Sequence, residues 1–376
     1  MTTGARRLDL SPYLRRQPVT LTLLTGVMVV FFLAVSTLAR IHDAQRESLA
    51  ERWAQRGIDN LNAQQFKPAV ADFHTALLYS RDNAAYQLSL AQALMGLKHY
   101  DEAQVYLVNL WEREPDNGMV SLELARIAVA KNETEQALRY YHNAIYGTWP
   151  SNPDVGRRKT RLELISYLMR IDARPQAVAE LIDLGATVGD NAAEQEQLGD
   201  MFAQVGDYVR ALAAFRTSLS LKRHNPAALA GAGAAAFKLG QYVEAEHYLE
   251  EALAAYPGDA ETQQLLKMTE YVLHWDPYRQ GLSQVQQNHI VMAAFAAAGA
   301  RLKSCNPPDA PEQEYEQQWA KLKPQMTERA LEQTPGLVNT AMKLAFEIEK
   351  ESASTCGAQT ETDQALLLVA SLHEEE

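Results

Sequence analysis

Few residues of this chain could do chemistry, and their spacing forms no recognisable catalytic set. The stretch GAGAAAF, which begins at Gly231, superficially resembles a phosphate-binding loop. Such a loop requires a strand before it, whereas this stretch lies inside an apolar helical pattern, so its glycines are interpreted as helix-packing residues. His247 and His274 have no neighbour at metal-ligand spacing in the sequence. The sequence therefore predicts no enzyme activity, no metal site and no cofactor.

The two cysteines, Cys305 and Cys356, are the remaining reactive side chains, and both lie in the last quarter of the chain. A bond between them would close a loop of about 52 residues and add roughly 4 kcal/mol of stability in the chain-entropy treatment. Disulfides persist mainly outside the cytosol. The sequence thus predicts a Cys305–Cys356 disulfide if this region lies outside the cytoplasm. The alternative is two buried apolar thiols.

The net charge of the chain limits the classes of molecule that it could bind. The net charge of the 376 residues is −12, which disfavours nucleic acid because phosphate binding depends on Lys and Arg. The stretch GRRKTR, from Gly156 to Arg161, is a basic cluster in acidic surroundings. It fits a solvated helix start, and the alternatives are a docking site for an acidic partner or for lipid head groups.

Residues 19–39, VTLTLLTGVMVVFFLAVSTLA, contain no charged side chain. As a helix they would extend for about 31 Å, close to the hydrocarbon thickness of a bilayer. The alternative is a cleavable signal peptide, whose apolar region is usually about 7–15 residues long. This stretch is longer, and Ala34-Val35-Ser36 is only a permissive cleavage site. We therefore expect an uncleaved transmembrane helix over residues 19–39.

The orientation of this helix rests on weaker signals. Four arginines precede it and four follow it before residue 57, so the count of Lys and Arg is tied. The short leader, residues 1–18, and the cysteine pair favour a cytoplasmic N-terminus. The bulk of a single-pass membrane protein would then lie in the periplasm or another extracytoplasmic space.

The elements that must position any site come from a repeat that begins near Ser48. One alanine recurs at intervals of 34, 34, 40, 34 and 34 residues: Ala69, Ala103, Ala137, Ala177, Ala211 and Ala245. In each copy an apolar helical stretch and a polar turn precede a second helix, which carries this alanine and a large apolar residue four positions later. A small side chain lets two antiparallel helices cross closely. Hairpins that cannot bury their apolar faces alone must then stack on one another.

The best-preserved copy contains Gly233, Tyr242, Ala245, Ala252 and Pro257. These residues and their counterparts in other copies resemble the tetratricopeptide repeat, from about Ser48 to Asp259. The resemblance implies an all-α fold with an α-solenoid and a role in protein–protein binding, without identifying the partner. The expected protein is a single-span, membrane-anchored repeat protein of bacterial type. Its expected parts are a helix over 19–39, about six repeats plus a cap helix over 48–275, and a helical C-terminal region over 282–376.

The third and fourth copies depart from the pattern. The third has Thr134 where an aromatic residue is expected, and the fourth carries Pro175 early in its second helix. Between them the insert YGTWPSNPDVG, from Tyr146 to Gly156, accounts for the 40-residue interval. Loops absorb insertions at little cost, so a surface loop is one interpretation. A hinge or an edge contact for a partner is the other.

The repeat family usually binds an extended or helical peptide on the concave face lined by the first helices. By register, the predicted partner groove consists of Leu88, Gln92, Met95, Leu122, Arg126, Val129, Leu162, Ser166, Met169, Glu196 and Asp200. The Lys/Asn/Arg clamp with which some family members bind a terminal carboxylate is absent. A helix or hydrophobic peptide therefore fits better than an acidic tail. For some of these residues the alternative is packing between repeats.

Beyond the repeats, the sequence predicts a cap helix over 260–275 and further helices near 283–304, 312–333, 335–351 and 360–373. This region is either a small helical domain or an extension packed on the superhelix. We expect the whole protein to be a membrane-tethered scaffold or adaptor for peptide or helical segments of envelope proteins. The alternative is a constitutive structural subunit of a larger membrane complex. An accessory regulator of an enzyme is a third hypothesis, which the sequence does not separate from the first.

Overall fold

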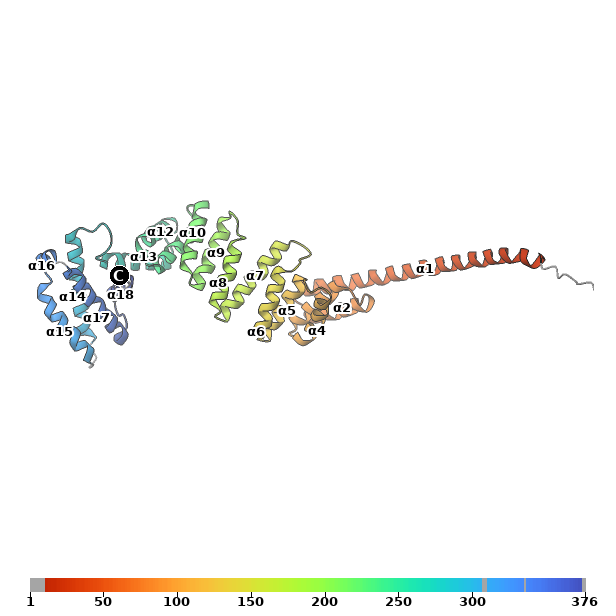
Figure 1. The fold of residues 1–376 in the computed structure, drawn as a ribbon, viewed down its shortest axis with the longest axis horizontal. Coiled ribbons are helices and arrows are strands. Elements are labelled where there is room, and N and C mark those ends of the chain that lie inside the picture. The colour runs from red at the N-terminus through yellow and green to blue at the C-terminus, as the bar shows by residue number, and fades with distance from the viewer. Residues whose placement is uncertain (1–10, 306–309, 335, 374–376) are drawn as a thin grey trace, which may run out of the picture. The chain divides into compact units, whose positions relative to one another are not determined.

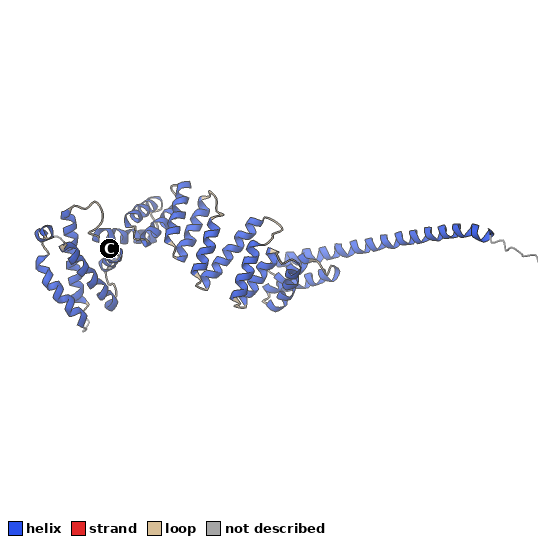
Figure 2. Cartoon of the chain, in the orientation of Figure 1, coloured by secondary structure: helices blue, strands red, loops and turns tan. Residues whose placement is uncertain are grey.

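The computed structural model describes residues 11–305, 310–334 and 336–373. Every regular element in these ranges is helical, apart from an isolated bridge between Asn117 and Thr148 (Figure 2). The predicted all-α fold is confirmed, with helix pairs in a solenoid-like series and a long apolar helix near the N-terminus (Figure 1). Leader residues 1–10 and linker residues 306–309 lie outside the described ranges.

The chain divides into two compact units, Met1–Leu164 and Ile165–Glu376. The first contains α1 (Ser11–Asn62), α2 (Phe66–Tyr79), α3 (Ala84–Gly96), α4 (Tyr100–Arg113), α5 (Gly118–Ala130) and α6 (Thr134–Tyr146). Helix α7 (Pro153–Arg170) crosses the boundary. The second continues with α8 (Arg174–Gly185), α9 (Ala192–Val205), α10 (Tyr208–Leu221), α11 (Pro226–Lys238), α12 (Tyr242–Ala255) and α13 (Ala260–Trp275).

The turn of every hairpin contains one residue in the left-handed backbone region. These residues follow the first helix of each pair: Gln64, Lys98, Asn132, Asp172, Gly206 and Gly240. Only the two glycines adopt this conformation without a steric cost from Cβ. The second helix then begins at the predicted aromatic residue in four pairs, at Phe66, Tyr100, Tyr208 and Tyr242. In the fourth pair, Pro175 lies in the first turn of α8, where its missing N–H removes no helical hydrogen bond.

Close packing within each hairpin depends on small residues of the first helix. The registered alanines of the second helices are all fully buried. Gly199 lies against the ring of Phe215, where an added Cβ atom would be 2.7 Å from the ring. In α11, Gly233 faces Leu249 in the same way, and Gly231 faces Phe215 of the preceding pair. The stretch GAGAAAF is therefore an interior helical segment with packing glycines, as predicted.

The C-terminal region contains α14 (Gln284–Ser304), α15 (Ala310–Leu322), the 3-10 helix η1 (Lys323–Gln325), α16 (Glu328–Gln333), α17 (Leu337–Cys356) and α18 (Glu361–Leu372). The single helix predicted over 312–333 is wrong, because Pro324 interrupts the α-helical hydrogen bonding and the chain turns there. Helices α14, α16, α17 and α18 share one apolar core, and α18 also packs on α13. The region is thus an extension with its own core, attached to the last helix of the repeats.

The C-terminal region contains a disulfide and, beside it, a buried polar cluster. Cys305, which follows α14, is bonded to Cys356, the last residue of α17. Beside the bond, Arg301 donates a hydrogen bond to the carbonyl just after Cys356 and lies 3.7 Å from Asp363. Glu349 is 1% exposed, and neither of its carboxylate oxygens has a hydrogen-bond partner among the described residues. Burial, and then the charge of Asp363, raise the pKa of Glu349 to about 7 against the opposing charge of Arg301.

We expect Glu349 to make the folded protein less stable as the pH rises from about 5 to about 8. A carboxyl group whose pKa is raised by folding stabilises the folded state below its ordinary pKa, and that contribution is lost as the pH passes through the folded value. The ordinary value is 4.5 and the folded value about 7, so the loss is on the order of 3 kcal/mol.

The substitution Glu349→Gln should remove this part of the pH dependence, measured by thermal unfolding of the full chain in detergent. Glu347→Gln, at a half-buried position of the same helix, is the matched control and should keep the wild-type dependence. An unchanged pH profile in Glu349→Gln would show that Glu349 does not titrate with folding.

Candidate functional site

A pocket on the first helices of the first unit is the candidate site. It has a volume of about 330 Å³ and lies between the start of α3 and the start of α5, bordered by the end of α4. Its walls include Leu88, Gln92, Leu110, Met119, Val120 and Pro150. Leu88 and Gln92 are predicted groove residues, whereas the other four were not assigned to the groove from the sequence. The pocket surface is mainly apolar, and the polar side chain of Gln92 lies on one side of it.

Helix caps and small side chains create this pocket. Asn83 caps α3 and Asn117 caps α5, each by accepting hydrogen bonds from backbone N–H groups two or three residues later. These caps start both helices at the same side of the pocket. The first turns of α3 then present Ala84, Ala85 and Ser89, which are too small to fill the space between the helices.

The insert between the third and fourth repeats forms one wall. Gly118 N donates to Thr148 O at 2.8 Å, and Thr148 N donates to Asp116 O at 2.7 Å, so the insert is joined to the turn before α5. The indole of Trp149 lies against Gly118 and donates to a carbonyl in the last turns of α6 at 2.9 Å. These contacts hold Pro150 at the pocket. The insert is therefore an ordered part of the site.

The basic cluster GRRKTR lies in the first turns of α7, directly after this insert. Arg157 donates a hydrogen bond to the Gly147 carbonyl at 3.3 Å. Gly156 faces the Trp149 ring, where an added Cβ atom would be 2.5 Å away. Part of the cluster thus supports the insert, a packing role that its charge alone did not indicate.

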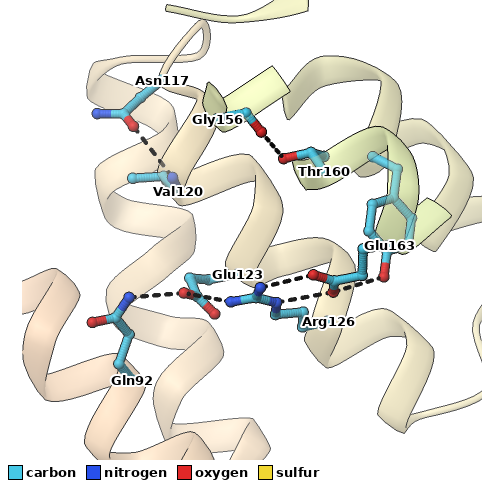
Figure 3. A network of polar contacts seen from close by, with 9 residues as sticks. Gln92, Asn117, Val120, Glu123, Arg126, Gly156, Thr160 and Glu163 are labelled. Carbon is cyan, nitrogen blue, oxygen red and sulfur yellow. Dashed lines mark hydrogen bonds and ion pairs between the residues drawn. The ribbon is translucent and has the colours of Figure 1, made fainter. Parts of the chain in front are cut away.

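Beside the pocket, a network of polar side chains joins four helices (Figure 3). Gln92 on α3 donates to Glu123 on α5 at 2.8 Å, and Arg126 donates to the same carboxylate oxygen at 3.1 Å. Arg126 also donates two hydrogen bonds, of 2.9 and 2.7 Å, to Glu163 on α7. The hydroxyl of Tyr141 on α6 donates to Glu163 at 3.1 Å. Two-point pairing of Arg with a carboxylate adds geometric specificity, so the network fixes these helices against one another.

Both members of the central ion pair stay charged. Burial alone would raise the pKa of Glu163, but the hydrogen bonds and charge of Arg126, with the Tyr141 hydroxyl, lower it below its usual value. The hydrogen bond to Glu163 raises the pKa of Arg126, against the effect of burial. The Arg126 guanidinium therefore already donates hydrogen bonds to Glu163 and Glu123. A carboxylate of a partner would have to displace one of them.

The remaining predicted groove residues of the first unit differ in accessibility. Met95, Val129 and Leu162 are half-buried and lie on the first helices. Leu122 is only 7% exposed and belongs to the core, so it packs the repeats together, which is the alternative that the register left open.

Four predicted groove residues lie in the second unit. Met169 and Glu196 are half-buried, whereas Ser166 and Asp200 are exposed. Asn225 donates a hydrogen bond to Glu196, and burial together with the charge of Glu196 raises the pKa of Asp200. Across the part of the chain that the structure describes, no cluster of His, Cys, Asp and Glu side chains could hold a metal ion.

Sequence models of the tetratricopeptide repeat match residues 88–153 and 202–268. These stretches contain the registered alanines Ala103, Ala137, Ala211 and Ala245. The chain therefore contains tetratricopeptide repeats, as its 34-residue pattern predicted. No curated protein matches the sequence.

Several solved structures are similar in fold. YrrB, described as a TPR protein with an unusual peptide-binding site, is 15% identical and covers 52% of this chain and 97% of its own, with a TM-score of 0.39. PilW, a type IV pilus biogenesis factor, is 19% identical and covers 58% of this chain and 98% of its own, with a TM-score of 0.39. The C-terminal part of a TPR repeat-containing protein from Cytophaga hutchinsonii is 15% identical and covers 69% and 98%, with a TM-score of 0.44. At these identities the similarity concerns the fold alone.

Removing one member of the Arg126–Glu163 pair should destabilise the first unit. We expect Glu163→Gln to lower the free energy of unfolding by about 1–2 kcal/mol, because Arg126 loses a two-point partner. The side chains are 34% and 30% exposed, and solvent screening keeps the effect in this range. Arg126→Met combined with Glu163→Gln should cost less than the sum of the two single changes, by about 1 kcal/mol.

Urea unfolding of the four proteins in detergent measures this coupling. The control is Asp101→Asn, which breaks the ion pair with Lys131 at a position where Asp101 is 96% exposed. That change should cost less than about 0.5 kcal/mol. Strict additivity of the Arg126 and Glu163 changes would show that the pair does not hold the helices together.

Proposed function

We propose that this chain is a membrane-tethered scaffold or adaptor that binds a peptide or helical segment of an envelope protein on the first helices of its repeats. The observation that carries the proposal is the open pocket between α3 and α5, where the half-buried Leu88 and Met119 present apolar surface above the buried Val120. An apolar anchor side chain of a helix or an extended peptide fits such a pocket. The predicted groove residues of the second unit, including Met169, are proposed as a second contact surface.

Helix α1 would supply the tether. Leu21–Asn62 contains a window apolar enough to cross a membrane, and none of that window is buried inside the structure. Phe31 and Phe32, for example, are 68% and 70% exposed. A continuous apolar surface of this kind is unstable in water, so a bilayer is its natural surrounding. A signal sequence has the same composition. The uncleaved anchor is preferred because the apolar stretch is longer than a usual signal region.

We place the repeats outside the cytoplasm and the N-terminus inside it. The Cys305–Cys356 disulfide supports this side, because such bonds are rare in the cytosol.

Cysteine labelling in spheroplasts tests this orientation. Arg81→Cys, at an exposed position in the α2–α3 turn, should react with a membrane-impermeant maleimide without permeabilisation. Thr3→Cys, in the leader, should react only after the membrane is opened. Cys305 and Cys356 should stay unreactive until a reductant is added, because they are bonded to each other. The reverse pattern for the two introduced cysteines would place the repeats in the cytoplasm.

A structural subunit of a larger membrane complex is the second candidate. It is favoured by valines that the second helices expose to solvent: Val105, Val209 and Val243, at 69%, 66% and 67%. A subunit that used these outer faces would co-purify in fixed stoichiometry, whereas an adaptor that used the pocket would be recovered with its partner only in part.

Charge introduced into the pocket separates the two candidates. Met119→Asp and Leu88→Asp should each reduce partner recovery at least tenfold, because an apolar anchor would then bury an unpaired carboxylate. Val105→Asp, on the outer face of α4, is the matched control and should leave recovery unchanged. Quantitative mass spectrometry of detergent-solubilised complexes gives the readout. Loss of the partner in Val105→Asp with retention in both pocket variants would favour the structural subunit.

A further inference from the structure

The apolar part of α1 continues without a break into the first repeat. The helix runs from Ser11 to Asn62, so the predicted span, residues 19–39, and the first helix of the first hairpin are one rod (Figure 1). No flexible linker separates the membrane from the repeats. The height of each repeat element above the bilayer can therefore be counted along α1, at about 1.5 Å per residue.

Contacts with α1 set the height of α2 and α3. Arg46 donates a hydrogen bond to the carbonyl of Tyr79, at the end of α2, at 3.1 Å. Burial, followed by the charges of Glu51 and Glu47, raises the pKa of Tyr86 in the first turn of α3. The end of α2 and the start of α3 are thus level with residues 46–51 of α1. These residues lie about 10–18 Å beyond the end of the span.

The pocket lies at this same edge of the first unit. Arg113, the last residue of α4, lies 3.8 Å from Asp82 in the α2–α3 turn, and the first residues of α3, Ala84 and Ala85, line the pocket. The pocket is also lined by residues from the end of α4 and the start of α5, and by Pro150 of the insert. The pocket therefore lies beside the α2–α3 turn, next to the part of the first unit that contacts α1 just beyond the predicted span.

The rim of the pocket is acidic. The stretch EPDN, from Glu114 to Asn117, joins α4 to α5 and carries two carboxylates and no basic residue. Glu114 of this stretch lines the pocket. Asp82, in the α2–α3 turn, is 89% exposed and lies 3.8 Å from Arg113, the last residue of α4. An apolar pocket with an acidic rim is complementary to an apolar side chain that is followed by Lys or Arg.

We propose that this pocket binds the juxtamembrane segment of another membrane protein, through an aliphatic or aromatic residue flanked by Lys or Arg. Segments that leave a bilayer carry these residue types, because aromatic side chains favour the interface and basic side chains flank the span. The anchor residue would lie roughly 3–6 residues beyond the partner's span if extended, or roughly 7–12 if helical. This inference rests on the proposed function, since it names the partner of the same pocket.

The test combines a photo-crosslinking amino acid at Met119 with a change in pocket height. Seven helix-forming residues inserted after His42 add about two turns and lift the pocket by about 10 Å while nearly preserving its direction. The matched control carries the same seven residues after Thr3, ahead of the span, where they leave the height unchanged. Thermal unfolding of each protein in detergent confirms that the repeats are intact.

In the wild type and the control, the crosslink should map to a partner within about 12 residues of its span. The insertion after His42 should reduce this crosslink at least fivefold, or move it outward along the partner by about 3–7 residues. A crosslink to a soluble protein, or one that the insertion does not change, would overturn the juxtamembrane inference and leave the adaptor function intact. The absence of any specific crosslink from Met119 or Leu88 would instead overturn the adaptor function itself.

Discussion

The close crossing of two helices in each hairpin is the contact on which the array depends. In the first pair, Gly57 lies against the ring of Phe73, and an added Cβ atom would be 2.8 Å from that ring. The ring can fill this space only because the facing residue has no side chain. The same exchange of a small for a large residue recurs with Gly233 and Leu249 in the sixth pair. Each hairpin therefore presents similar outer faces, and neighbouring pairs can stack with little adjustment. Function must then come from positions where the copies differ.

Much of this architecture could be predicted because packing residues repeat. The registered alanines, the aromatic residues that begin second helices, and the cap helix over 260–275 all follow from local pattern and are found in the structure. The break at Pro324 was missed, although proline is a local signal, since the surrounding residues read as one amphipathic helix. The C-terminal core could not be derived, because contacts such as those of α14 with α17 join segments far apart in the sequence.

The site was predicted only in part, for a physical reason. Register places Leu88 and Gln92 on the same helix face, and both line the candidate pocket, but a pocket also needs space between helices, which depends on the distance between the helices. Pro150 reaches the pocket only because the insert pairs with the turn before α5. Arg126 was predicted to meet a partner, yet it binds Glu163, 37 residues further on. The register, with its 40-residue interval, aligns Arg126 with Ser166 and not with Glu163, so it does not predict this pair.

Under the proposed membrane tethering, the unbroken α1 affects how selectively a small pocket could bind. A flexible linker would give the pocket a high effective concentration near the bilayer but would leave its height and direction free. A continuous helix removes most of that freedom before any partner arrives, so less conformational entropy is lost on binding. A polar network also reduces conformational freedom near the pocket, because it fixes α3, α5 and α7 against one another. It consists of Gln92, Glu123, Arg126 and Glu163. In the proposed juxtamembrane binding, an apolar pocket of about 330 Å³ would then select partners by the height at which their segments leave the bilayer, as well as by side-chain chemistry.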